Sequence, residues 1–152
     1  MKRISITLLP FLLACCSALT GEEVGRLPIN KVSREQDFVS KEATVELKAG
    51  DEIVFWSEMD FEYEGNVDLR FRVEIQKDGE QYENIQVDPM QKDLTIGETK
   101  VTVNGKTTWS FSGQNVIFNV QEDGKYNFKG ILVSSDNNSL VVKKAELVLK
   151  RI

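Results

Sequence analysis

The chain has 152 residues, of which 41% are hydrophobic and 28% are charged, a size and composition typical of one globular domain. It contains no histidine, which excludes Ser-His-Asp and Cys-His catalysis, imidazole bases and every metal site built on histidine. The formal net charge of −5 argues against a nucleic-acid partner, because binding phosphates requires a basic face.

The first fourteen residues have the organisation of an export signal. Lys2 and Arg3 form a short basic region, and residues 4–14 form an apolar run that is too short to span a bilayer as a helix. We therefore predict that residues 1–14 are a signal peptide that is removed.

The end of this run, Leu12-Leu13-Ala14-Cys15, resembles the lipobox of bacterial lipoproteins, in which a small residue precedes an obligatory cysteine. The resemblance implies that Cys15 carries diacylglycerol on its sulfur and an acyl chain on its nitrogen, with Cys16 as the neighbouring alternative. The protein would then be anchored in the bacterial cell envelope, on the periplasmic or the surface face. The other possibility is ordinary secretion with cleavage after Ala18.

Residues 15–41 are predicted to be a lipidated N-terminus followed by a flexible tether. The segment is polar, contains Gly21, Gly25 and Pro28, and shows no sustained period of 2 or 3.6. The folded domain is accordingly expected to cover residues 42–152.

From residue 43 onward the hydrophobic pattern has the period of a β-strand. Apolar and polar residues alternate over residues 67–75, and Asp78-Gly79 then predicts a turn into a return strand at 82–87. A second hairpin is indicated by Asn104-Gly105 between residues 101–103 and 107–111. Further strands are predicted at 44–48, 52–63, 115–121, 125–135 and 139–150, the last with a bulge near Lys143 and Lys144.

About nine strands with turn signals every 8 to 12 residues predict an all-β protein, an antiparallel β-sandwich of the jelly-roll type. A closed barrel is the alternative. The pattern resembles the jelly-roll sandwiches of carbohydrate-binding and galactose-binding-like modules, and this resemblance implies a binding function without assigning any residue.

The acidic run from Glu58 to Asp68 is the most pointed feature of the domain. Alternation places Glu58, Asp60, Glu62 and Glu64 on one side of a strand, where such close like charges need solvent, a cation or a basic partner. A solvated strand face with Arg70 and Arg72 as cross-strand partners is one interpretation, and a calcium site is the other.

Trp56 shares its strand parity with Glu58 and Asp60, whereas Ile53, Phe55, Met59 and Phe61 share the opposite parity. If the latter set forms the core, Trp56, Glu58 and Asp60 are candidate ligand-binding residues. An exposed aromatic ring beside carboxylates suits a sugar, whose apolar face stacks on the ring. The alternative is that Trp56 is buried, as tryptophan is on average.

Charge is unevenly spread along the chain, with 14 acidic and 4 basic residues from 51 to 98 and 4 acidic and 8 basic residues from 99 to 152. Catalysis has one remaining route, a carboxylate pair of the glycosidase type, and nothing marks such a pair. We expect no enzyme activity, no cofactor and no metal. The sequence predicts a lipid-anchored envelope module that engages a protein partner, with carbohydrate binding as the alternative and a glycosidase third.

Overall fold

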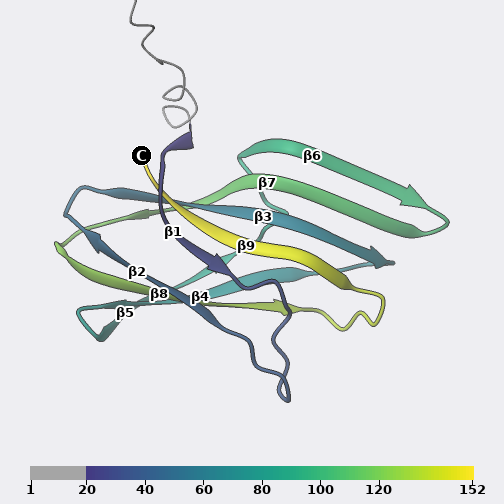
Figure 1. Ribbon diagram of the computed structural model, residues 1–152, viewed down its shortest axis with the longest axis horizontal. Coiled ribbons are helices and arrows are strands. Elements are labelled where there is room, and N and C mark those ends of the chain that lie inside the picture. The colour runs from purple at the N-terminus through teal and green to yellow at the C-terminus, as the bar shows by residue number, and fades with distance from the viewer. Residues whose placement is uncertain (1–19) are drawn as a thin grey trace, which may run out of the picture.

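The computed structural model describes residues 20–152, so the predicted signal peptide and the candidate lipidation site Cys15 lie outside the described residues. Within this part of the chain, nine strands form two antiparallel sheets that pack as a β-sandwich (Figure 1). The strands are β1 (Glu22–Pro28), β2 (Lys41–Leu47), β3 (Glu52–Glu64), β4 (Leu69–Lys77), β5 (Glu80–Val87), β6 (Leu94–Val103), β7 (Lys106–Asn119), β8 (Gly124–Ser134) and β9 (Val141–Arg151). The predicted fold class is confirmed.

The chain passes repeatedly from one sheet to the other. The five-stranded sheet has the order β1-β9-β3-β7-β6, and the four-stranded sheet has the order β2-β8-β4-β5. This jelly-roll-like crossing places β3 in the middle of the larger sheet, between strands that follow it in sequence by about 50 and 90 residues. Strand pairing is therefore mostly long-range.

Alternation along β4 shows how the sequence specifies the sandwich. Leu69, Phe71, Val73 and Ile75 are each at most 1% exposed, whereas the residues between them lie at least partly in solvent. In β3 the predicted core set of Ile53, Phe55, Met59 and Phe61 is buried in the main core, and residues of the opposite face near the start of the strand are buried in a separate small cluster. One face of each strand thus supplies the core, and the other faces outward.

Both predicted Gly-containing hairpin turns are present. Asn104 and Gly105 have φ angles of 50° and 80°, and Asp78 and Gly79 have φ angles of 50° and 84°. Two consecutive positive φ angles define the type I′ turn, whose twist matches that of the flanking strands. These turns fix the β6–β7 and β4–β5 registers.

The predicted strands at 107–111 and 115–121 are in fact one strand, β7. The pairs Phe55–Val116 and Trp56–Gln114 leave Asn115 as an extra residue, so a bulge shifts the alternation without ending the strand. The Oδ1 atom of Asn115 accepts a hydrogen bond from the amide of Ser57 at 3.1 Å and occupies this gap in the ladder.

The bulge predicted near Lys143 and Lys144 is confirmed. Lys144 pairs with Asp60 and Val142 pairs with Phe61, which leaves Lys143 as the extra residue in β9. The apolar parity of β9 changes at this point for that reason.

The prediction of a flexible tether through residue 41 is wrong for the described part of that segment. Residues 22–28 form β1, which pairs with β9 along its length. Leu27 and Ile29 are 0% and 2% exposed and belong to the main core. An edge strand contributes few inward residues, and a bulge between Glu23 and Gly25 interrupts the alternation, so β1 has no clear period in the sequence.

The two ends of the sandwich are formed by different strand ends and connections. We call the end where Glu22, Glu52 and Asn119 lie near Arg151 and the C-terminus the N-terminal end of the sandwich. At the opposite end, which we call the distal end, β3 stops at Glu64 and the segment 134–140 connects β8 to β9. The connection 29–40 also extends away from the C-terminus (Figure 1).

Candidate functional site

The structure places Trp56, Glu58 and Asp60 together on the outward face of β3, as strand parity predicts. Their neighbours across the ladder are Val148, Glu146 and Lys144 of β9. The three candidate residues do share one face, so the question is whether that face is available to a ligand.

Trp56 does not form an exposed platform. Its side chain is 1% exposed and forms a small apolar cluster with Val54 and Val148. The ammonium of Lys150 lies 4.4 Å from the ring centroid, over the ring face that a sugar would use. The sugar-platform interpretation of Trp56 is therefore wrong and the alternative of a buried ring is confirmed, because side chains of β3 and β9 enclose the ring.

Glu58 is held in a network of ion pairs. Its Oε2 accepts hydrogen bonds from Arg26 at 3.0 Å and from Lys144 at 2.6 Å, and the same guanidinium also bonds Glu146. Burial raises the pKa of Glu58, but the hydrogen bonds from Arg26 and Lys144 outweigh it and leave this pKa below its ordinary value. Glu58 is thus an ionised structural residue.

Glu62 is paired in the same way, with the ammonium groups of Lys106 at 3.1 Å and Lys143 at 3.4 Å. The hydrogen bond from Lys106 is the main reason that the pKa of Glu62 is lowered. Asp60 lies between these two glutamates in sequence and makes no ion pair with any residue from 20 to 152.

The prediction that Arg70 and Arg72 are the cross-strand partners of the β3 carboxylates is wrong, since Glu58 and Glu62 pair with other bases. Those arginines lie on β4 in the other sheet, where Arg70 pairs with Asp68 and, at 3.1 Å, with Asp88. The interpretation of the run as a strand face with basic partners holds, but its bases come from β1, β7 and β9. The loop form of a calcium site is wrong, because β3 continues to Glu64.

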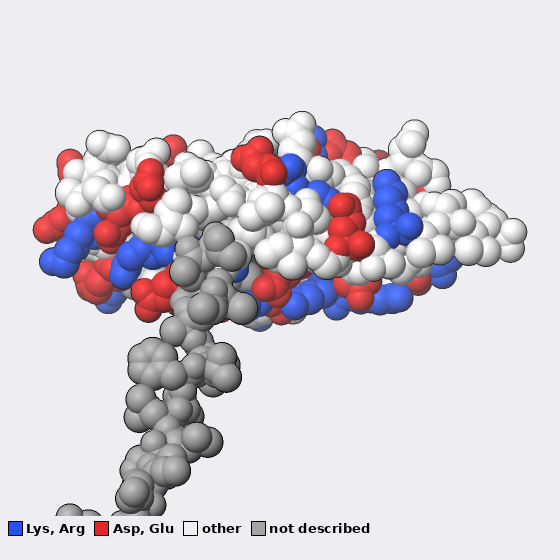
Figure 2. Space-filling view, turned by 90° about the horizontal axis from the view of Figure 1, so that it is seen from above, with Lys and Arg blue, Asp and Glu red and all other residues white. Residues whose placement is uncertain are grey.

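The uneven charge along the sequence is balanced by this pairing. β3 belongs to the acidic part of the chain, and its neighbours β7 and β9 belong to the basic part. Figure 2 shows acidic and basic side chains interspersed over the face that it presents. The folded domain therefore has no large single-sign field on this face that could steer a charged partner.

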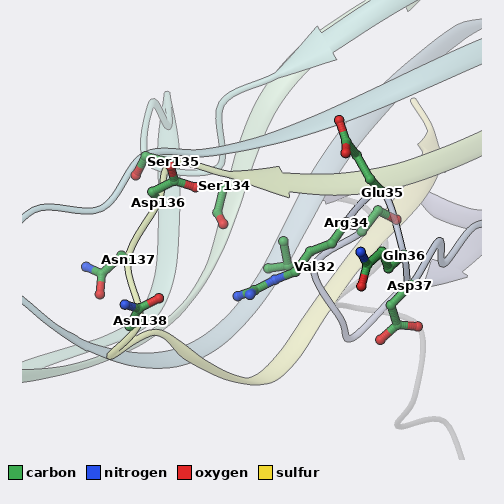
Figure 3. A pocket seen from close by; sticks show the side chains of 11 residues that line it. Val32, Arg34, Glu35, Gln36, Asp37, Ser134, Ser135, Asp136, Asn137 and Asn138 are labelled. Atoms are coloured by element: carbon green, nitrogen blue, oxygen red, sulfur yellow. The ribbon is translucent and has the colours of Figure 1, made fainter.

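A polar cleft lies at the distal end, with a volume of about 670 Å³. It lies between the connection from β1 to β2 and the connection from β8 to β9 (Figure 3). We call it the polar cleft; it is lined by Val32, Ser33, Arg34, Glu35, Gln36, Asp37, Ser134, Ser135, Asp136, Asn137 and Asn138.

One wall of the polar cleft is a tight turn that the chain builds locally. The backbones of Arg34 and Asp37 exchange two hydrogen bonds of 3.0 Å, and Asp37 pairs with Lys31. The amide of Ser33 donates to the carbonyl of Leu132 at 2.7 Å, which attaches the turn to β8. The wall is thus fixed to the sandwich.

The other wall is held by Asn137. Its Nδ2 donates to the carbonyls of Glu64 and Asn66, and its Oδ1 accepts from the amide of Ser139 at 2.9 Å. Ser135 is also occupied, since its Oγ accepts from the amide of Asp68 at 3.0 Å. The side chains of Asn137 and Ser135 therefore shape the cleft, and few of their hydrogen-bonding groups remain available to a ligand.

Other polar groups of the cleft are free to bind. Arg34 extends across the cleft toward Asn138 in Figure 3. The side chains of Arg34, Asp136 and Asn138 make no hydrogen bond or ion pair with the part of the chain that the structure describes. A guanidinium, a carboxylate and an amide offer both donors and acceptors to a polar partner. The sequence indicated a turn at residues 136–138 but assigned Arg34 to the tether.

Residues 20–152 contain no group of three or more cysteine, aspartate or glutamate side chains placed to hold a metal ion. The same residues include no long apolar helix of the kind that crosses a bilayer. No protein-family model matches the chain, and no curated protein matches it.

Proposed function

We propose that this protein is a non-catalytic binding module that is anchored to the bacterial cell envelope through Cys15 and engages a protein partner at its distal end. The observation that carries the proposal is the polar cleft with its unpaired Arg34. A desolvated guanidinium contributes to an interface only when a partner supplies the matching acceptors, which makes the contact specific.

The position of β1 supports this arrangement. Glu22, the first residue of β1, follows Cys15 by only seven positions, a distance of at most roughly 25 Å along the chain. A lipid on Cys15 would keep the N-terminal end of the sandwich close to the bilayer. The polar cleft would then open away from the membrane, where a partner can reach it.

Two observations argue against the other functions. A glycosidase needs a general acid whose pKa is raised, and the lowered pKa values of Glu58 and Glu62 do not suit these two residues to that role. A sugar platform on Trp56 is excluded by the burial of its ring.

Site-specific photo-crosslinking in the membrane-anchored protein tests the proposal. A crosslinker at Asn138 in the polar cleft is expected to capture one discrete protein band, which mass spectrometry identifies. The matched position is Lys48, which is exposed in the turn between β2 and β3 at the N-terminal end and should capture no such band.

Arg34→Glu is expected to abolish the crosslink from Asn138, because it reverses the charge that the partner meets, and Arg34→Lys should retain part of it. Equal capture from Lys48, or capture from Asn138 that persists with Arg34→Glu, would contradict the proposal.

A further inference from the structure

A second hollow lies on the outward face of the four-stranded sheet, separate from the polar cleft. Its volume is about 380 Å³, within the usual range of about 300 to 1,000 Å³ for small-molecule sites. We call it the Phe38 groove; it is lined by Phe38, Arg72, Val73, Glu74, Asn84, Ile85, Gln86, Lys129 and Ile131.

Phe38 supplies an aromatic surface that the fold leaves open. Its side chain is 66% exposed and makes no ring contact with another aromatic residue in the described chain. The neighbouring residue Val39 is fixed by two hydrogen bonds with the Oγ of Ser33, of 2.6 Å through its carbonyl and 3.0 Å through its amide. The ring is thus exposed on a backbone that is held in place.

The polar side chains of the groove project from adjacent strands. Arg72 pairs across the ladder with Gln86, and Glu74 pairs with Asn84 on one side and Lys129 on the other. Of these five side chains, only that of Glu74 has a hydrogen-bond partner within residues 20–152: the Nε2 of Gln76 donates to its Oε1 at 2.7 Å. The groove that Phe38 lines therefore offers hydrogen-bond donors and acceptors, most of which have no partner in the described chain.

We propose that the Phe38 groove binds a pyranose unit of a glycan. The CH-rich face of a pyranose packs on an aromatic ring, and its hydroxyl groups both donate and accept hydrogen bonds. The carboxylate of Glu74 accepts such bonds, Arg72 and Lys129 donate them, and the amides of Asn84 and Gln86 do both. This site does not depend on the proposed partner contact at the polar cleft.

The composition of the groove favours a sugar over a peptide. An apolar peptide side chain that fills the groove would bury part of its polar lining, which includes Asn84 and Gln86, and burying polar groups without partners costs free energy. A sugar satisfies these groups while it covers the ring. Small-molecule binding sites are typically apolar surfaces with a few polar groups that orient the ligand.

A glycan array probed with the purified full-length protein in detergent tests the inference. The expected result is binding to a defined set of glycans, followed by measurement of the dissociation constant for the strongest one by calorimetry. Phe38→Ala should weaken that binding at least about tenfold, equivalent to about 1.4 kcal/mol. Phe38→Tyr should retain it, because the ring face is unchanged.

The control is Ile117→Ala, a side chain of β7 in the other sheet that is 47% exposed, and it should leave glycan binding unchanged. Phe38→Ala should not shift the melting temperature, because the ring lies mostly in solvent. Arg34→Glu should abolish partner crosslinking without affecting the glycan, so the two proposals can fail separately.

Absence of any bound glycan on the array overturns the inference. It is also overturned if Phe38→Ala and Ile117→Ala weaken glycan binding equally. Binding of peptides in place of glycans, with dependence on Phe38, would identify the groove as a protein contact and overturn it as well.

Discussion

Single side chains acquire their roles here from the neighbours that the fold gives them. Trp56 and Phe38 are both aromatic residues near polar groups in the sequence, and one is 1% exposed while the other is 66% exposed. Trp56 lies on the central strand of a five-stranded sheet, and Phe38 lies on a connection at the surface. A ring at the first position contributes to stability, and a ring at the second is free to bind.

Trp56→Ala is expected to lower the free energy of unfolding by about 3 to 5 kcal/mol, because it leaves a cavity beside Val54 and Val148. Urea denaturation monitored by circular dichroism measures this change. Phe38→Ala is the matched aromatic substitution and should have little effect on the denaturation midpoint. A midpoint for Trp56→Ala as high as that of Phe38→Ala would show that the ring is not part of the packed structure.

Glu58 makes the stability of the domain depend on pH. Its pKa in the folded protein lies below the ordinary value of 4.5, so its contribution is complete above about pH 4.5 and is lost as the pH falls through the lower folded value. We expect Glu58→Gln to be less stable at pH 7, where it removes an ionised partner of Arg26 and Lys144. Its stability should then fall less steeply with acid.

Urea midpoints measured from pH 7 to pH 3 test this expectation. Glu35 is an exposed acid in the turn between β1 and β2 that makes no ion pair within the described residues, so Glu35→Gln is the control. It should keep the wild-type pH dependence. Parallel curves of urea midpoint against pH for Glu58→Gln and wild type would show that the Arg26–Glu58 pair contributes nothing to the pH dependence of stability.

At the scale of elements, the long central strands were predictable and the edge strand was not. β4 and the second half of β3 alternate because one face is core and the other is solvent, whereas residues 53–57 of β3 are buried on both faces. β1 has a bulge and a glycine within seven residues, and its apolar contribution to the core amounts to Leu27 and the adjoining Ile29. Its pairing with β9 satisfies the outer backbone groups of the larger sheet.

Removal of β1 is therefore expected to destabilise the domain. A chain that begins at Val39 loses two fully buried side chains and exposes the edge of β9, at a cost of about 3 to 6 kcal/mol from apolar burial alone. Guanidinium denaturation of this chain, compared with one that begins at Thr20, measures the difference. Equal midpoints would restore the interpretation of residues 20–38 as a tether.

For the whole molecule, the start of β1 at Glu22 and the polar cleft lie at opposite ends of the sandwich. With the proposed lipid on Cys15, the short segment 16–21 before β1 would restrict rotation of the domain relative to the membrane. Such an arrangement limits which partners can reach the polar cleft, and it depends on the modification of one cysteine.

Cys15→Ala is expected to release the protein from the membrane fraction and to abolish metabolic labelling with a fatty acid, because the thiol is the acceptor of the diacylglycerol. Fractionation with immunoblotting and labelling with an alkyne fatty acid measure both effects. Cys16→Ala is the control and should remain labelled and membrane-bound. Label that persists in Cys15→Ala and disappears in Cys16→Ala would move the anchor by one residue.

Local pattern alone determined the all-β class, the two type I′ turns, the inward set of β3 and the bulge at Lys143. Each of these depends on neighbours in the chain: a period of two residues, a pair of residues that adopt positive φ, or a shift of parity within one strand. No information about other strands is needed to read them.

Tertiary structure alone decided which residues meet. Three contacts join distant parts of the chain. Glu58 pairs with Arg26 and Lys144, and Trp56 is buried against Val148. Residues 32–37 meet residues 134–138 in the polar cleft. Strand order in a sandwich is set by the packing of both sheets together. A single strand's sequence shows which face is apolar, but not which strand lies beside it.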